Sequence, residues 1–408
     1  MKMLNWLLLR FYQLLCELVY FCAYPLLWLF LKGKNYTEAL NARSQTADIL
    51  IHAASLGEIN ALSALIKRLL AEGHSVAINT ITVTGKKRAQ ELFPQLQVRL
   101  APFDILHLKQ QQLKHLKPKL ILIAETEIWP NMLYAAQNAE IHVLFINARI
   151  SEKSLKAYLP IKGLLSIVSN SVKGIMAQSQ ADAGRFSRIF DLPIKNLGNL
   201  KYALELPIIE SEKQRADLGY AKNDFILVWG SSRPKEEALL LKVLPELQRK
   251  IPELKLIIAP RHPKRICEVQ ELLKDLNYQL YSQRKAGAAP DILLIDVLGR
   301  LNAIYAISDL SIVGGSFGDF GGHNPLEPAF YQKAIIMGGN YSSCKDSVRS
   351  LLQREAILIS DSDKLAGDII KLYLNPALRQ KMGKNAKKVL TENAAALSLH
   401  LMEIEKCI

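Results

Sequence analysis

Short apolar segments alternate with amphipathic helical segments along most of this chain of 408 residues. A parallel sheet needs this order, because each strand is followed by a helix that packs on one face of the sheet. The alternation runs in two series, separated by the charged and irregular residues 203–223. The apolar segments are 48–53, 75–81, 119–124, 141–146 and 174–177 in the first series, and 224–229, 254–259, 292–297, 309–313 and 334–337 in the second. We therefore predict an α/β protein in which two Rossmann-like domains, residues 45–202 and 224–408, face a cleft and are joined by the linker 203–223.

The N-terminal residues 3–31 are rich in leucine and aromatic side chains, and Arg10 and Glu17 are their only charges. Residues 11–31 are about as long as a helix that crosses the hydrocarbon core of a membrane, roughly 20 residues. Because Glu17 and Pro25 make such a span marginal, a helix lying in the membrane surface is an alternative, and a buried core helix is a third. No cleavage site of small residues is present, which argues against a secretory signal. We predict that residues 1–34 form a single membrane anchor.

Basic residues predict where the rest of the chain lies. Lys32, Lys34 and Arg43 follow the apolar segment, whereas Lys2 precedes it, and positive flanks remain on the cytoplasmic side. The formal net charge of +14 is spread along the chain without an arginine-rich tail. This favours an anionic membrane surface and phosphorylated substrates as partners over nucleic acid. The five scattered cysteines indicate neither zinc nor a disulfide framework.

A glycine-rich turn links the apolar segment 309–313 to a predicted helix that begins at Asn324. Backbone N–H groups of such a turn, here at Gly314 and Gly315, can approach an anion closely, and a helix N-terminus adds partial positive charge. Glu327 lies one turn into the helix, where its carboxylate could accept hydrogen bonds from a ribose diol. A purely structural glycine turn is the alternative, and the spacing does not fit the dinucleotide-binding fingerprint.

Two loops of the first domain carry carboxylates directly after a strand. Parallel α/β sheets bind ligands outside the carboxyl ends of their strands, so catalytic groups are expected in these loops. Glu58 begins a helix and could take a proton from an acceptor hydroxyl, or it is a first-turn acid stabilised by the helix dipole. Glu125 and Glu127 leave a buried strand and need partners, which favours function over helix capping.

The corresponding loops of the second domain carry hydroxyl and cationic side chains. Ser231 and Ser232 follow its first strand and suit phosphate or carboxylate binding. Arg261 and His262 follow the next strand and could bind an anionic leaving group, although a surface pair is the alternative. Lys201 lies near the linker and could face the cleft. Elsewhere, residues 361–363 resemble a metal-binding acid pair, but they precede a helix and are expected to cap it.

Together these loops resemble those of the Kdo transferases (3-deoxy-D-manno-octulosonic acid transferases) of lipopolysaccharide synthesis. The matching strings, which follow the family's order over nearly the whole chain, are residues 52–58, 125–131, 147–149, 198–202, 260–263 and 314–328. The resemblance implies a GT-B fold whose second domain holds the donor. It further implies transfer of Kdo from CMP-Kdo to a lipid A precursor at the cytoplasmic face of the inner membrane of a Gram-negative cell. By resemblance Glu58 is the catalytic base and Glu125 a second essential carboxylate.

The resemblance also gives the remaining residues roles. Inverting transfer needs one base, and CMP is a leaving group that fixed dipoles and cations can stabilise without a metal or a cofactor. Within the donor site, Glu327 is expected to bind the ribose and Lys201 the Kdo carboxylate. The full set of predicted donor-binding residues is Ser231, Ser232, Arg261, His262, Gly314, Gly315, His323, Asn324, Glu327 and Lys201.

Two segments depart from the family pattern. Residues 35–47 carry few charges where family members often have an Arg- and Glu-rich segment, and residues 296–301 differ from the form Asp-Thr-x-Gly-Glu-Leu. One alternative function is that of another GT-B enzyme using a UDP-sugar, such as a lipid A disaccharide synthase or a UDP-GlcNAc epimerase. The other is a catalytically inactive, membrane-tethered binding protein.

Overall fold

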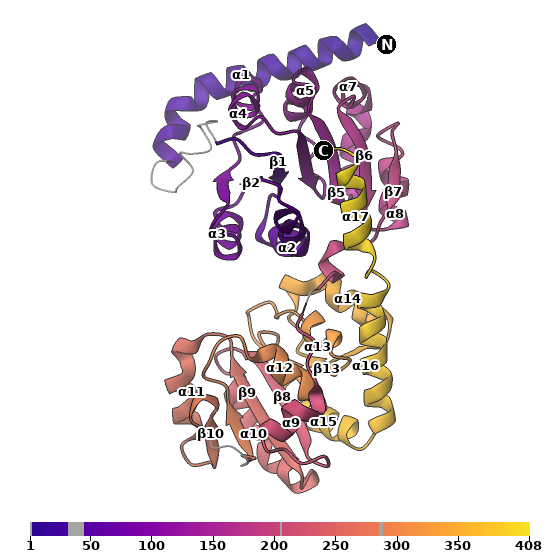
Figure 1. Cartoon of the computed structure of the whole chain (residues 1–408). Helices are drawn as coiled ribbons and strands as arrows, with labels where there is room; N and C mark the ends of the chain where they lie inside the picture. Colours follow the sequence, from indigo (N-terminus) through magenta and orange to yellow (C-terminus); the bar gives the residue numbers. More distant parts are fainter. Residues whose placement is uncertain (1, 32–44, 205, 285–288) are drawn as a thin grey trace. The chain divides into compact units, whose positions relative to one another are not determined.

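The computed structural model describes residues 2–31, 45–204, 206–284 and 289–408, which form two compact units (Figure 1). The first unit comprises Met1–Ala203 and Asn393–Ile408, and the second comprises Leu204–Glu392. Each unit is built on a parallel sheet, so the predicted α/β class with two Rossmann-like units is confirmed. The basic residues expected beside the membrane, Lys32, Lys34 and Arg43, lie outside the described residues.

The first unit contains a seven-stranded sheet in the order β3-β2-β1-β4-β5-β6-β7, with helices on both faces. The strand order reverses between β1 and β4, so the loops after these two strands border the crevice where such sheets bind ligands. The strands are β1 Ile49–His52, β2 Val76–Thr80, β3 Gln97–Leu100, β4 Leu120–Ala124, β5 His142–Ala148, β6 Val172–Ala177 and β7 Ile194–Asn196. The helices are α1 Lys2–Leu31, α2 Leu56–Ala71, α3 Val83–Leu92, α4 Leu106–Leu116, α5 Pro130–Asn138, α6 Glu152–Tyr158, η2 Leu159–Ile161, α7 Lys162–Val168, α8 Gln180–Phe186, η3 Leu200–Tyr202 and α17 Ala396–Glu405.

The second unit repeats this plan with the order β10-β11-β9-β8-β12-β13-β14, and its reversal lies between β8 and β12. The strands are β8 Phe225–Ser232, β9 Leu254–Pro260, β10 Tyr278–Leu280, β11 Ile292–Leu294, β12 Leu310–Val313, β13 Ala334–Met337 and β14 Ile357–Ile359. The helices are α9 Ser211–Asp217, α10 Glu236–Lys250, η4 Pro263–Arg265, α11 Ile266–Leu273, η5 Tyr281–Gln283, α12 Leu301–Ile307, α13 Leu326–Phe330, η6 Ser342–Cys344, α14 Lys345–Gln353, α15 Leu365–Tyr373 and α16 Pro376–Thr391.

The ten predicted strands are the ten interior strands of the two sheets. The strands that the sequence did not indicate are β3, β7, β10 and β14, and each is the edge of its sheet. Interior parallel strands are covered on both faces and therefore read as continuous apolar runs. The edge strands β3, β7 and β10 contain polar residues, and β14 is apolar but only three residues long, so none of them forms a long apolar run.

The unit boundaries differ from the predicted domains at the C-terminus. The predicted second domain ran to residue 408, but α17 packs into the core of the first unit through Leu401 and Ile404. His400 is buried there and its Nε2 accepts a hydrogen bond of 3.2 Å from the backbone N–H of Asn147. The predicted linker also contains α9, which joins the second unit because Ser211 Oγ donates to the Ala306 carbonyl at 2.7 Å.

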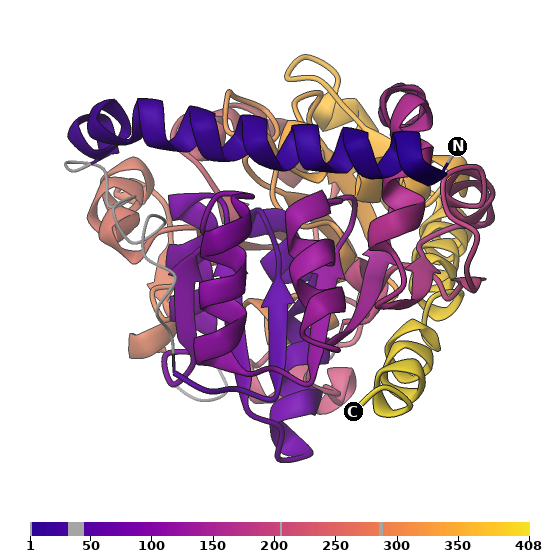
Figure 2. The same ribbon diagram turned by 90° about the horizontal axis from the view of Figure 1, so that it is seen from above.

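The N-terminal helix α1 lies along the outside of the helices α4, α5 and α7 (Figures 1 and 2). Its segment Met3–Ala23 is long and apolar enough to cross a membrane, judged by length and composition. Leu9 and Gln13 are buried against the unit. Arg10 donates to Tyr134 at 3.5 Å, and Glu17 accepts from His107 Nδ1 at 2.6 Å. Both charges of this segment are therefore bonded to the first unit.

Candidate functional site

Glu58 lies at the start of α2, in the loop-to-helix connection after β1, where the strand order of the first sheet reverses. Ser55 caps this helix, and its Oγ donates to Glu58 Oε1 at 2.8 Å while the Ala54 N–H donates to Oε2 at 2.7 Å. The helix-start alternative is therefore correct as a description of local structure. It does not exclude catalysis, because burial raises the pKa of this carboxyl to about 7, with smaller raising effects from Glu125 and Glu127. A carboxyl with this pKa is partly ionised at neutral pH and can accept a proton.

Glu125 and Glu127 follow β4, the strand next to β1. Glu125 has a left-handed backbone with φ 51°, a strained conformation for a residue with a side chain. Glu127 Oε2 accepts a hydrogen bond of 2.9 Å from Trp129 Nε1, and burial raises the pKa of Glu127. Because both acids raise the pKa of Glu58, the two loops bring three carboxyl groups within electrostatic reach of one another.

A buried lysine that the sequence analysis did not identify lies under this loop. Lys109 Nζ is 4.1 Å from the centroid of the Trp129 ring and donates to the Pro102 carbonyl at 2.6 Å. His52 meets the same ring edge to face, with centroids 4.6 Å apart. Burial lowers the pKa of Lys109 to about 7, and burial followed by the Lys109 charge lowers that of His52 to about 3. These two side chains fix the indole that bonds Glu127.

In the second unit, the first amides of the glycine turn are already bonded within the chain. The N–H groups of Gly315, Ser316 and Phe317 donate to the carboxylate of Glu236 at 2.8, 3.0 and 3.1 Å. The N–H of Gly314 donates to the Gly230 carbonyl at 2.8 Å. The reason given for expecting an anion at Gly314 and Gly315 is therefore wrong, because an acid of the chain already occupies the turn.

The cationic side chains beside that turn form a cluster around Arg233. Arg233 donates from Nε to His323 Nε2 at 3.1 Å and from Nη1 to His262 Nε2 at 2.7 Å. Burial, followed by neighbouring arginines, lowers the pKa of His323 to about 4 and also lowers that of His262. Both histidines are therefore neutral acceptors at pH 7. Within the described residues, the guanidinium of Arg261 has no hydrogen-bond partner.

The other predicted donor residues have different surroundings. Glu327 lies in α13, a helix of five residues, where burial raises its pKa and Arg261 lowers it. Asn324 Oδ1 accepts from the Leu326 N–H at 3.1 Å. Ser232 Oγ donates to the buried carboxylate of Glu237 at 2.6 Å, and this bond occupies its hydroxyl hydrogen.

The last two predicted donor residues, Ser231 and Lys201, belong to different units. Ser231 lines a pocket of about 110 Å³ together with Arg261 and residues 295–299, which include part of the segment that departs from the family pattern. Lys201 lies in η3 of the first unit, and its N–H donates to Asn199 Oδ1 at 2.8 Å.

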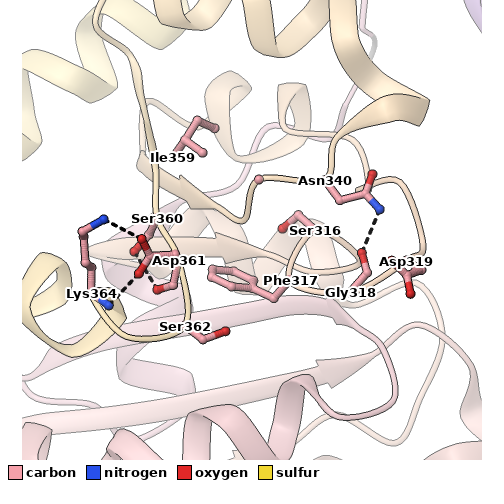
Figure 3. A pocket seen from close by; sticks show the side chains of 11 residues that line it. Ser316, Phe317, Gly318, Asp319, Asn340, Ile359, Ser360, Asp361, Ser362 and Lys364 are labelled. Carbon is pink, nitrogen blue, oxygen red and sulfur yellow. Dashed lines mark hydrogen bonds and ion pairs between the residues drawn. The ribbon is translucent and has the colours of Figure 1, made fainter.

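A wider pocket of about 430 Å³ lies at the carboxyl ends of β12, β13 and β14 (Figure 3). Asp361 at its rim accepts from the Lys364 N–H at 2.9 Å and pairs with Nζ of the same lysine at 2.6 Å. Asp361 thus closes the turn before α15, whereas α15 itself begins after Lys364 without a side-chain cap, so the predicted capping of the helix is not observed.

The loops of both units can be compared with known proteins. A family model described as 3-deoxy-D-manno-octulosonic-acid transferase (kdotransferase) matches residues 32–204, and one described as glycosyl transferases group 1 matches residues 210–389. The chain is 31% identical over 362 residues to a 3-deoxy-D-manno-octulosonic acid transferase of Haemophilus influenzae, which covers 86% of this chain and 84% of that protein. The chain belongs to the Kdo transferase family. It is a glycosyltransferase, and the two matched segments coincide closely with the two units.

Other similarities are broader. A bifunctional glycosyltransferase/methyltransferase of Fusobacterium nucleatum is 30% identical over 321 residues, which are 75% of this chain and about half (49%) of that protein. The solved UDP-GlcNAc 2-epimerase of Neisseria meningitidis superposes with a TM-score of 0.53 at 14% identity, covering 88% of this chain and 99% of that chain. This likeness concerns the fold alone, and it agrees with the predicted GT-B class.

Proposed function

We propose that this Kdo transferase moves Kdo from CMP-Kdo to a lipid A precursor, with inversion and without a metal. The observation that carries the proposal is Glu58, a buried carboxyl with a pKa of about 7 at the crevice of the first sheet. Glu58 takes the proton of an acceptor hydroxyl while the hydroxyl oxygen bonds to the anomeric carbon of Kdo. The bond from that carbon to the phosphate oxygen breaks, and CMP leaves with the bonding electron pair.

The leaving phosphate is stabilised by side chains of the second unit. Arg261 lies within electrostatic reach of Glu327 and Arg233, and Arg233 is held by hydrogen bonds to two neutral histidines. Guanidinium groups bind phosphate through charge-assisted hydrogen bonds and need no metal for this. Glu327, within electrostatic reach of Arg261, accepts hydrogen bonds from the ribose, and the pocket of about 110 Å³ beside Arg261 takes the base.

The reaction is tested with the full chain in detergent, a tetraacylated lipid A precursor and freshly generated CMP-Kdo. Mass spectrometry of the lipid should show a gain of one or more Kdo units, both with and without EDTA. No gain with a competent donor would contradict the acceptor or the donor, and loss of the gain in EDTA would contradict the metal-independent mechanism. A parallel reaction with a UDP-sugar distinguishes the alternative donor class.

Replacing Arg261 with alanine should raise the Kd for CMP about 10- to 100-fold. A hydrogen bond to a charged group contributes roughly 1.5–3 kcal/mol, and each 1.4 kcal/mol changes affinity about tenfold. Isothermal titration calorimetry measures the change. Arg249→Ala is the matched control, because it removes the same charge from the exposed last turn of α10. Equal affinities of the Arg261 variant and this control would remove Arg261 from the donor site.

The location proposed for the enzyme is the cytoplasmic face of the inner membrane, with α1 lying in the plane of the lipid surface. Its outward residues Leu7, Phe11, Leu14 and Leu18 are each 60–70% exposed and all apolar. A spanning α1 would have to leave its contacts with the first unit and carry the charges of Arg10 and Glu17 into hydrocarbon, which is costly. An in-plane helix with one apolar face avoids both requirements.

Spin labels at Leu7, Leu14 and Leu18, one per variant, should report the same shallow depth in vesicles that contain anionic lipid. An in-plane helix keeps these positions at one level, whereas a spanning helix places them at successive depths. Electron paramagnetic resonance with oxygen and a nickel chelate measures the depth, in a background without the native cysteines. A label at the exposed Ile208 of the second unit serves as the aqueous reference. A depth that changes steadily along α1 would exclude the in-plane arrangement.

A further inference from the structure

Glu236 is a buried acid that the proposed reaction leaves without a chemical role. It is the first residue of α10 and only 2% exposed. Its Oε2 accepts from the N–H groups of Arg233 and Gly315 at 2.9 and 2.8 Å, and its Oε1 accepts from Ser316 and Phe317 at 3.0 and 3.1 Å. Both carboxylate oxygens are therefore used twice, always by backbone amides.

These four amides belong to two different loops. Arg233 is in the loop after β8, and Gly315 to Phe317 are in the loop after β12, so the carboxylate bridges the point where the strand order reverses. The same loops carry the side chains that meet in the cation cluster, Arg233 from one and His323 from the other. The His323 N–H donates to the Gly314 carbonyl at 3.0 Å, which ties His323 to the bridged turn.

The space between the loops is closed to any side chain at Gly314. A Cβ there would lie 2.4 Å from the Ser231 carbonyl oxygen and 2.8 Å from Glu236 Oε2. The backbones of the two loops are thus in direct contact, and the Glu236 carboxylate accepts hydrogen bonds from N–H groups of both loops. Leaving buried N–H groups without a hydrogen-bond acceptor costs free energy, so the two loops would rearrange if the Glu236 carboxylate were removed.

We infer that Glu236 is a positioning residue of the donor site, which holds the loops after β8 and β12 at the separation where Arg233 bonds His323. The inference rests on the proposed function, because it takes CMP as the ligand of these loops. It has a consequence for recognition. The N–H groups of Gly315, Ser316 and Phe317 are already bonded to Glu236, so these amides are not free for the phosphate, and we assign its binding to the guanidinium side chains.

The test is Glu236→Gln in the full chain. Glutamine is nearly isosteric but offers one oxygen in place of two, and its NH₂ group would face two amide donors. We expect the Kd for CMP, measured by calorimetry, to rise about tenfold or more. Asp309→Asn is the matched control: Asp309 also accepts a backbone N–H, from Ile226 at 2.8 Å, but it precedes β12 at the opposite end of that strand. The control should lower the urea midpoint and leave the Kd within about twofold.

A second measurement does not depend on CMP. Amide exchange of residues 314–320, followed by mass spectrometry without ligand, should be faster in Glu236→Gln than in the wild type and unchanged in Asp309→Asn. Glu236→Asp, which keeps both oxygens, should recover part of the affinity and part of the protection. An unchanged Kd in Glu236→Gln, or equal exchange in wild type and variant, would overturn the role of Glu236. Failure of the wild type to bind CMP would count against the proposed donor, and the exchange result would still decide the inference.

Discussion

Glu58→Gln should reduce Kdo transfer by about 10²- to 10⁴-fold, the range lost when a general base is removed, while CMP binds as it does to the wild type. The amide oxygen can still accept from the Ala54 N–H, and the amide NH₂ group can donate to Ser55 Oγ, so α2 keeps much of its cap. It cannot take a proton from the acceptor hydroxyl. The lipid mass assay gives the rate, and calorimetry gives the affinity for CMP. Loss of CMP binding together with transfer would contradict the assignment of Glu58 to the acceptor.

The pH dependence of transfer provides a second test of the base. Burial raises the pKa of Glu58 to about 7, and only the ionised form can accept a proton, so transfer should increase as the pH rises through about 7. The charges of Glu125 and Glu127 contribute to that raised pKa. Glu125→Gln should therefore move the rise to lower pH in whatever activity remains. A profile that is flat between pH 6 and 8 in the wild type would contradict Glu58 as the titrating group.

Arg265→Met should destabilise the second unit by about 3–5 kcal/mol, the cost of breaking a buried ion pair. Arg265 donates from both terminal nitrogens to Glu237, at 2.7 and 3.0 Å, and the side chain of Glu237 is only 1% exposed. Removing the arginine leaves this carboxylate buried without its cation. Urea unfolding followed by circular dichroism measures the loss.

Two variants make that result specific. Arg354→Ala breaks the pair with Glu392, whose partners are 44% and 49% exposed, and should cost less than about 1 kcal/mol. The double variant Glu237→Gln and Arg265→Met removes the buried charge together with its partner, so it should be more stable than Arg265→Met alone. If Arg265→Met alone were no less stable than Arg354→Ala, the ion pair between Arg265 and Glu237 would not stabilise the second unit.

Strands buried on both faces could be predicted from this sequence, whereas edge strands and the packing of the C-terminal helix could not. The interior strands were predicted because burial on both faces requires continuous apolar runs. Among them, β11 is clearly shorter than predicted, since it ends at Leu294 and the predicted segment ran to residue 297. The edge strands were missed because one side of each is not paired. The C-terminal helix was assigned to the wrong unit, since its contact with Asn147 joins residues 253 positions apart and leaves no local pattern.

By itself, the sequence determined the fold class, the family and the loops that carry the chemistry, because apolar runs place strands and the residues that follow them lie at one edge of a sheet. Only the tertiary structure decided which groups in those loops meet. It placed the carboxylate of Glu236 on the turn that read as an anion site, and Lys109 beneath the indole that bonds Glu127. From the sequence alone, a charged residue in an amphipathic helix is expected to face solvent, because partners that are distant in the sequence leave no local pattern. The physical reason is that burial and hydrogen-bond pairing depend on long-range packing, whereas the pattern along the chain reports only which face of each element is apolar.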